Sequence, residues 1–496
     1  MSLESLTATL ALVGIVILIS SLLSGAVERT GLPLVAIFLL VGVALGPSGL
    51  RLVDFALHSP ALQAISILGL VLVLFSDAIG VDVGEIKQQK KLALAILGPG
   101  TLLPAALIGF AGWSLLDLSI PAASILGAAL ASTDPVLLRT LIRHPNMPPT
   151  ARLALRLESG MNDVILLPIV VLSILALQSR SAGAHPDLGR HIVGLFILGP
   201  ALGVAVGYIA ITLLDQVRKR VGVRRDYESL YALGVAFTAY AAAESVGGSG
   251  FLAAFAAGLS VAALDVELCD CFLDYGEASA EMFLLLTFVA FGTSLIWTGI
   301  KIASLGTLLF AAIALVGRTL VLLPVLSMAG VKGKDRWIIS LFGARGLSSL
   351  LLVLLPVFAG IVGSEDLFAV TCLVVLLSVV LHGGGIAWYL RSVAGSQPAA
   401  SHPSAVSYKP SAKSHQPSAI GNQPSAALPE KITLDEVRAL MASGAPVVLG
   451  DVRTERSWRD DDLEAKGAIR LPPDDAVRLA REIGLSHHAT VVLYCA

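Results

Sequence analysis

Long apolar runs, separated by short polar segments, follow one another from Leu6 to Leu390. Each run can cross the hydrocarbon core of a bilayer as a helix, and the period-two alternation that a membrane β-barrel requires is missing. The pattern therefore predicts an all-α polytopic membrane protein with thirteen transmembrane helices. We place them at 6–23, 33–46, 62–78, 92–116, 121–138, 160–177, 192–214, 230–244, 250–264, 281–300, 302–325, 338–358 and 367–390.

The positive residues of the loops indicate an orientation. Loops after the odd-numbered spans up to span eleven hold 16 Lys and Arg residues, whereas the loops after the even-numbered spans hold 4. Because positive residues collect on the cytoplasmic side, we expect the N-terminus outside and the C-terminus in the cytoplasm. The regular alternation also supports thirteen spans, since a missed span would disturb it.

The composition excludes several classes of protein. Of the 496 residues, 55% are hydrophobic and only 14% are charged, whereas a soluble domain carries about 25% charged residues. A soluble enzyme is therefore excluded for most of the length. The net charge of −2 gives no basic field that would favour a nucleic-acid partner.

The composition changes after the last span. We expect a transmembrane domain at 1–394, a flexible linker rich in Pro, Ser and Ala at 395–430, and a small soluble part at 431–496. Proline recurs every seven residues in the linker, which excludes a coiled-coil helix there. The soluble part reads as a helix followed by two apolar strands, PVVLGDVR and TVVLYCA, which is the pattern of a partial α/β domain.

Ionisable residues inside the spans are the candidates for function. A charged side chain at lipid depth costs on the order of 3 kcal/mol unless it is paired or hydrated. At the ends of the spans, such a side chain can instead reach the interface. The ionisable residues in question are Asp77, Asp134, Glu158, Asp163, Glu244, Arg318 and Arg345.

Two spans carry signs of an interruption. ASTDPVLL at 131–138 places Asp134 and Pro135 inside an apolar run, and proline breaks helical hydrogen bonding. FGARGLSS at 342–349 places Arg345 between two glycines, which weaken a helix. Two interrupted helices in separate halves indicate a transporter built from inverted repeats, with its site where the two helices cross.

A third segment, LESGMNDVILLP at 157–168, contains two carboxylates. At about 100° per residue, Ser159 and Asp163 share one helical face with Asn162 beside them, and Glu158 lies about 140° away from Asp163. The two carboxylates can therefore have separate roles, with Asp163 the deeper of the two.

Together these segments resemble sodium/proton antiporters of the NhaP/NHE type. The similar segments are TDP at 133–135, ESGMND at 158–163, AESVGGSGFLAAFAAGL at 243–259, GRTL at 317–320 and GARGLSS at 343–349. They occur in the order seen in that family and cover roughly residues 10–390. The resemblance implies a homodimer in the cell membrane, in which a core bundle moves against a dimerisation domain in contact with lipid. It implies no cofactor beyond the transported ions.

The resemblance also implies roles for the residues that bind the ions. Asp163 would take either a cation or a proton. Asn162 stands where electrogenic relatives carry a second Asp, which implies electroneutral exchange. The remaining candidates for the cation's oxygen ligands are Thr133, Asp134, Ser159 and, in the third span, Asp77.

Glu158 would form an ion pair with a membrane-embedded arginine. The position of the GRTL motif favours Arg318 as that partner, and Arg345 would support the crossing helices.

A single carboxylate cannot hold a cation and a proton together, so competition for Asp163 would couple their movements. Carboxylate, hydroxyl and carbonyl oxygens suit Na⁺ as a hard cation. The sequence thus predicts exchange of Na⁺, or Li⁺, for H⁺. The alternative within the same fold is K⁺/H⁺ exchange, because selection by ion size depends on fine geometry.

The soluble part resembles a rhodanese domain. In that family Cys495 would be the nucleophile that carries a persulfide. The anion-binding loop and the helices expected after it are missing from the sequence, so we expect no working sulfurtransferase. Regulation of transport through a sulfur-binding tail is a third possibility, and otherwise we expect no enzyme.

Overall fold

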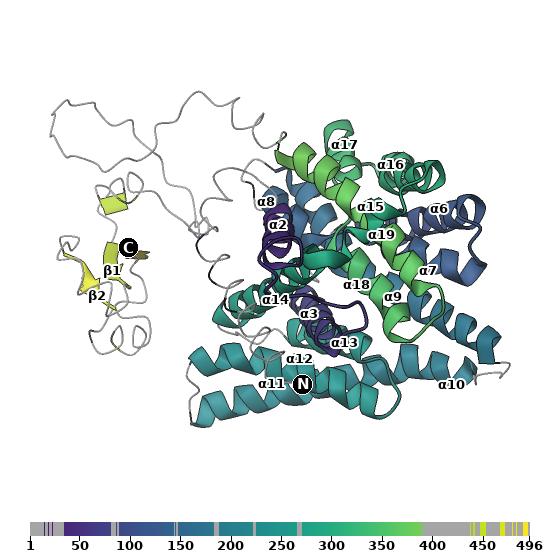
Figure 1. Cartoon of the computed structure of the whole chain (residues 1–496). Helices are drawn as coiled ribbons and strands as arrows, with labels where there is room; N and C mark the ends of the chain where they lie inside the picture. Colours follow the sequence, from purple (N-terminus) through teal and green to yellow (C-terminus); the bar gives the residue numbers. More distant parts are fainter. Residues whose placement is uncertain are drawn as a thin grey trace. The chain divides into compact units, whose positions relative to one another are not determined.

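The structure of the chain is a computed structural model (Figure 1). It describes most of residues 34–387 and parts of the soluble C-terminal segment. The described ranges are 34–80, 89–142, 147–182, 188–221, 225–264, 270–387, 447–452, 467–471 and 490–494, together with residues 14, 18, 22, 86, 144, 389, 437, 440, 441, 479 and 483.

Helices make up nearly all of the described membrane part. In chain order they are α2 (Leu34–Leu45), α3 (Pro60–Ile79), α5 (Lys90–Leu97), α6 (Pro99–Leu115), α7 (Ile120–Ala131), α8 (Pro135–Ile142), α9 (Pro149–Ala182), α10 (Leu188–Val193), α11 (Gly199–Arg220), α12 (Arg225–Ser245), α13 (Gly250–Ala263), α14 (Asp270–Ala290), α15 (Thr298–Lys301), α16 (Leu305–Met328), α17 (Gly333–Leu341), α18 (Leu347–Phe358) and α19 (Ser364–Ser378). Three short π-helical turns occur within them, namely η1 (Gly194–Leu198), η2 (Phe291–Leu295) and η3 (Val379–Gly383).

The predicted spans agree with these helices. Within the described residues, twelve of the thirteen are confirmed as a helix or as successive helices, and the first, 6–23, lies almost wholly outside the described residues. In the described part of the chain, eight helical segments are long and apolar enough to cross a membrane by length and composition, and three shorter apolar helices accompany them. The chain is thus a multi-pass membrane protein.

The helices form two packed groups. The first consists of α2, α3, α11, α12, α13 and α14, and the second of α5–α9 and α16–α19. The groups meet mainly where α3 packs on α9 and α18 and where α2 packs on α8; α15, which follows α14 and η2, packs on α19.

Small residues allow close packing inside both groups. A Cβ atom at Gly203 of α11 would lie 2.1 Å from the carbonyl oxygen of Ala253 in α13, and one at Gly127 of α7 would lie 2.4 Å from that of Ala105 in α6. Helices that lack a hydrophobic driving force in lipid associate through such close contacts.

The second group contains the same succession of spans twice. A helix, an interrupted helix and a further helix follow one another as α6, α7–α8 and α9, and again as α16, α17–α18 and α19. In both triplets the first helix packs on the first half of the interrupted one. Seven spans separate the starts of the triplets, and because that number is odd, the repeats are inverted.

The C-terminal segment is a unit of its own, 403–496, separate from 1–402. Its described part contains a parallel three-stranded sheet in the order β2–β1–β3, with β1 (Val447–Asp451), β2 (Ile469–Arg470) and β3 (Thr490–Tyr494). β1 and β3 fall on the two predicted apolar strands. The predicted linker and Cys495 lie outside the described residues.

Candidate functional site

The first interruption lies between α7 and α8. Ser132, Thr133 and Asp134 are not helical, and α8 begins at Pro135. Proline suits the first position of a helix, where its missing N–H is not needed. The Oδ1 atom of Asp134 accepts a hydrogen bond from the N–H of Val136 at 2.9 Å, so Asp134 caps the start of α8.

The same carboxylate also caps the second interrupted helix. Residues 342–346 separate α17 from α18, and the N–H of Leu347 donates to Oδ2 of Asp134 at 2.9 Å. The N–H of Asp134 in turn donates to the carbonyl of Ala344 at 2.9 Å. The two interruptions are therefore in direct contact, and one buried carboxylate stabilises the positive ends of two half-helices.

The glycines of the GARG segment make room for this crossing. A Cβ atom at Gly346 would lie 1.7 Å from Oδ2 of Asp134, and one at Gly343 would lie 2.3 Å from the guanidinium carbon of Arg318. Neither position can carry a side chain without moving its neighbour.

Two arginines bind the carbonyl ends of the other half-helices. Arg345 donates from Nη1 to the carbonyl of Ala131 at 2.9 Å and to that of Ser132 at 3.2 Å, at the end of α7. Arg318 donates from Nη1 to the carbonyl of Ser340 at 2.6 Å and from Nη2 to that of Ile339 at 3.0 Å, at the end of α17. A cation at the carboxyl end of a helix offsets its partial negative charge.

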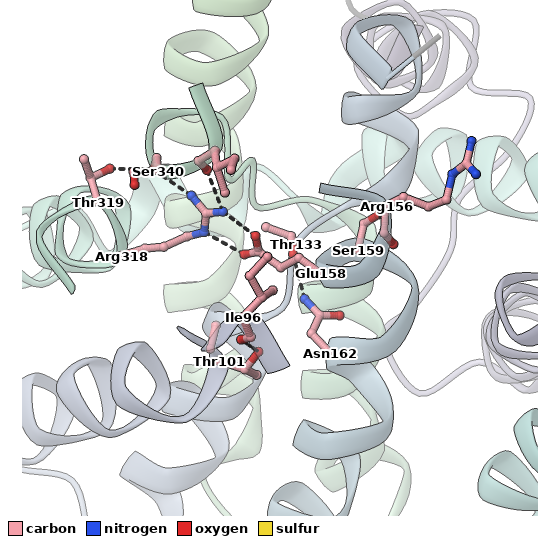
Figure 2. Close-up of polar contacts among 12 residues, drawn as sticks. Ile96, Thr101, Thr133, Arg156, Glu158, Ser159, Asn162, Arg318, Thr319 and Ser340 are labelled. Carbon is pink, nitrogen blue, oxygen red and sulfur yellow. Dashed lines mark hydrogen bonds and ion pairs between the residues drawn. The ribbon is translucent and has the colours of Figure 1, made fainter. Parts of the chain in front are cut away.

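Arg318 also forms the ion pair that the resemblance implies (Figure 2). Its Nε donates to Oε1 of Glu158 at 2.7 Å, and its Nη2 donates to Oε2 at 2.5 Å. Both side chains are buried, and the contact is bidentate. The guanidinium group therefore joins α9, α16 and the end of α17. Arg345 instead directs its Nη1 atom to the carbonyls of the crossing.

Asp163 lies about one and a half turns beyond Glu158 along α9. It is buried, and the hydroxyl of Ser132 donates a short hydrogen bond to its Oδ1 atom. Asn162 donates from Nδ2 to the hydroxyl of Thr133 at 2.7 Å (Figure 2). Adjacent residues of α9 thus contact adjacent residues of the first interruption.

The remaining expected ligands lie close to this point on α9. Ser159 is buried one turn before Asp163, and its hydroxyl donates to the carbonyl of Arg156 at 3.4 Å. Asp77 lies half-buried at the end of α3, against Gly160. A Cβ atom built at Gly160 would lie 3.4 Å from the Cβ atom of Asp77.

Glu244 lies away from the site, at the exposed end of α12, where its carboxylate accepts a hydrogen bond from the N–H of Gly250.

Sequence reasoning missed two residues of the site. The hydroxyl group of Ser132 donates to the carboxylate of Asp163, and the side chain of Ser348 interacts with the same carboxylate. The signal was present, because each serine belongs to a segment that the sequence marks as an interruption. What the sequence does not reveal is that the two interruptions bring both hydroxyl groups to one carboxylate of a third helix.

The chemistry of these side chains suits a hard monovalent cation. The site offers one carboxylate, several hydroxyl groups and the amide oxygen of Asn162, for which the described residues provide no donor. Within the described part of the chain, no three His, Cys, Asp or Glu side chains gather in the way that a transition metal requires.

Comparison with known proteins identifies the family. The model of a family described as "Sodium/hydrogen exchanger, transmembrane" matches residues 15–392, which include both interruptions and the whole site. The chain belongs to the sodium/hydrogen exchanger family. This is a family of secondary transporters, not of enzymes.

Several curated proteins are similar to this chain. The K(+)/H(+) antiporter NhaP2 of Shewanella sp. (strain ANA-3) is 27% identical over 381 residues, which cover 74% of this chain and 64% of the relative. The K(+)/H(+) antiporter NhaP of Alkalimonas amylolytica is 25% identical over 81% of this chain and 69% of the relative. The alignment with NhaP2 thus leaves about a third of that relative unmatched.

A solved structure has the same fold. The sodium proton antiporter MjNhaP1 from Methanocaldococcus jannaschii superposes with a TM-score of 0.61 at 20% identity, over 78% of this chain and 99% of that one. The predicted fold class of the membrane part, an all-α bundle with two crossing interrupted helices, is therefore confirmed.

Proposed function

We propose that this exchanger moves a monovalent cation and a proton in opposite directions across the membrane. The observation that carries the proposal is the buried carboxylate of Asp163, which lies at the contact of two interrupted helices among hydroxyl and amide groups. Irregular backbone at membrane depth is tolerated where it is packed in protein or lines an ion pathway.

Competition at Asp163 couples the two ions. A carboxylate that has bound a proton has lost the charge that attracts a cation, and a bound cation repels the proton. If the site changes from one side of the membrane to the other only when an ion occupies it, each such change carries either the cation or the proton. The KM for the cation then falls as the pH rises, because fewer protons compete.

Asn162 supports an electroneutral exchange. Its amide adds no charge, and its Nδ2 atom is already bound to the hydroxyl of Thr133. A single ionisable carboxylate at the centre then carries one positive charge in each direction. An imposed membrane potential should leave the rate unchanged.

Thr133 and Ser159 remain proposed ligands of the cation, whereas the contacts of Asp134 favour another role. Both of its oxygen atoms accept a backbone N–H, so we assign it to holding the crossing together. Asp77, beside Gly160 and half-buried, is proposed to lie on the approach to Asp163.

The group of helices that contains the crossing is proposed to move against the other group. In a homodimer, the group formed by α2, α3 and α11–α14 would hold the two copies together. The loop charges favour a C-terminus in the cytoplasm, and the cell membrane is the proposed location.

The transported cation is either Na⁺ or K⁺, and different observations favour each. The Na⁺/H⁺ exchange predicted from the sequence is favoured by the similarity to MjNhaP1, which is named a sodium proton antiporter. K⁺/H⁺ exchange is favoured by the curated relatives NhaP2 and NhaP, both named K(+)/H(+) antiporters. Regulation through Cys495 stays a prediction, because that residue lies outside the described part.

A vesicle assay tests the proposal. The full chain is reconstituted with a pH-sensitive dye, a proton gradient is imposed, and Na⁺, Li⁺ and K⁺ are added in separate runs, with and without a membrane potential. We expect at least one cation to dissipate the gradient, at a rate that the potential does not alter.

Asp163→Asn should abolish this exchange. The matched control is Asp117→Asn, which makes the same chemical change at an exposed position between α6 and α7. Cation-dependent proton movement that persists in Asp163→Asn would contradict the proposal.

A further inference from the structure

The hydroxyl groups around Asp163 come from two different half-helices. Ser132 lies in the first interruption and donates to Oδ1 of Asp163, and Ser348 lies in the first turn of α18 and reaches the same carboxylate. Both serines are buried, with exposed fractions of 0% and 4%. A buried carboxylate on α9 is thus held from both interrupted helices at once.

Ser132 is fixed through its backbone. Its carbonyl oxygen accepts hydrogen bonds from Nη1 of Arg345 at 3.2 Å and from the hydroxyl of Ser349 at 3.5 Å. The break in the helix leaves this carbonyl oxygen without a helical partner, and the two donors bind it instead. The side-chain hydroxyl is the group of Ser132 that remains able to change its partner.

A hydroxyl group can serve both states of the site. It has one O–H donor and two acceptor lone pairs, so it can donate to a bare carboxylate and, after rotation about the C–O bond, present a lone pair to a cation. The residue next to Asp163 contributes a second acceptor, because Oδ1 of Asn162 is buried with no donor among the described residues.

We propose that the hydroxyl groups of Ser132 and Ser348 are ligands of the transported cation and determine which cation this exchanger prefers. This inference rests on the proposed function, since it concerns the occupant of the same site. In the absence of the cation the two serines bind Asp163. When the cation enters, each hydroxyl group rotates about its C–O bond, so that a lone pair of the oxygen faces the cation and replaces part of its hydration shell.

This arrangement has a consequence for selectivity. The carboxylate attracts any monovalent cation, whereas two rigidly placed neutral oxygens contact an ion of one size better than another. Removing them should therefore weaken binding of the preferred cation most, so that the KM values for Na⁺, Li⁺ and K⁺ become more alike.

Replacement by cysteine is the sharpest test. Ser132→Cys and Ser348→Cys keep nearly the size of serine, but a soft sulfur is a poor ligand for a hard alkali cation. We expect KM for the preferred cation to rise roughly tenfold, the magnitude of one hydrogen bond to a charged group, with a much smaller change in maximal rate. Ser132→Thr, which keeps the hydroxyl group, should stay near the wild-type KM.

The control is Ser66→Cys on α3, a buried serine whose hydroxyl has no hydrogen-bond partner among the described residues. It makes the same change in the other group of helices and should leave the KM values unaltered. Calorimetric titration of the purified full chain with NaCl and KCl measures binding without transport and serves for any variant that moves ions too slowly.

The outcomes separate this inference from the proposed function. If the wild type neither binds nor exchanges an alkali cation, the proposed function fails. If the wild type does so and both cysteine variants keep its KM values and its preference among cations, the serines are not ligands and the proposed function stands. A raised KM that is equal for all cations would also overturn the assignment of selectivity.

Discussion

The Oδ2 atom of Asp134 occupies the space beside Gly346 that a side chain would need: an ideal Cβ atom would lie only 1.7 Å from it. Residue 346 must therefore be glycine for Asp134 to cap α18. This contact ties the two interrupted helices together across more than two hundred residues of sequence.

Gly346→Ala should consequently disrupt the crossing. The new methyl group would displace the carboxylate and break its bond to Leu347, and overpacking of this kind costs about 1–3 kcal/mol. We expect a lower melting temperature and loss of exchange, measured by thermal unfolding in detergent and by the vesicle assay. Gly384→Ala is the control, since nothing lies within 4 Å of a Cβ atom there; equal behaviour of the two variants would refute the steric argument.

Asp134→Asn distinguishes a cap from a cation ligand. The amide keeps one acceptor oxygen but turns an NH₂ group toward a backbone N–H, so one half-helix loses its cap and its compensating charge. We expect a loss of about 1–3 kcal/mol in stability, while KM for the cation changes little in the folded fraction. A large rise in KM at unchanged melting temperature would instead restore Asp134 to the cation's ligands.

Glu158→Ala should destabilise the protein more than it alters ion affinity. It would leave the buried guanidinium of Arg318 without its carboxylate, and breaking a buried pair in this way costs about 3–5 kcal/mol. The double variant Glu158→Met/Arg318→Met should recover part of that loss. Glu365→Ala, at an exposed carboxylate, is the control. Normal folding of Glu158→Ala with only a weaker cation affinity would show that the pair is not structural.

An ion pair links the two groups of helices at the end of the molecule that we propose to face the cytoplasm. Arg139 of α8 donates to Glu281 of α14, and both side chains are partly exposed. If the groups move against each other, Glu281→Gln removes a contact that resists the movement. We expect the maximal rate to rise up to about fivefold with KM unchanged, in keeping with the roughly 1 kcal/mol of a partly exposed pair.

Asp215→Asn provides the comparison for this variant. Asp215 and Lys219 form an ion pair within α11, which moves as one body, so breaking it should not change the rate. An identical response of the two variants would argue against relative movement at the contact of α8 with α14.

The sequence revealed the interruptions because proline and glycine leave a local signature. Pro135 and the glycines beside Arg345 mark the breaks to within a few residues of their positions. It could not reveal the pairing of Asp134 with Leu347, or of Arg345 with the carbonyls of Ala131 and Ser132. Those contacts depend on how two distant helices cross, and no local pattern encodes that geometry.

The limits of the helices differ from those of the predicted spans for a separate reason. The span predicted at 160–177 belongs to α9, which extends over Pro149–Ala182. Hydrophobicity reports where lipid surrounds a helix, whereas the helix itself continues through Arg152 and Arg156, whose polarity does not prevent helical hydrogen bonding. The predicted span, which contains Asp163, is therefore confirmed as part of a longer helix.

The two arginines and two acids of the crossing have a consequence for an empty transporter. In the described part of the group of helices that we propose to move, the buried charges besides Asp163 are Asp134, Glu158, Arg318 and Arg345, which cancel one another. If this group moves, an unoccupied Asp163 leaves it with a single uncompensated negative charge, and moving that charge through lipid-like surroundings is costly. The charge balance among these four residues would thus oppose movement of the site without a bound ion.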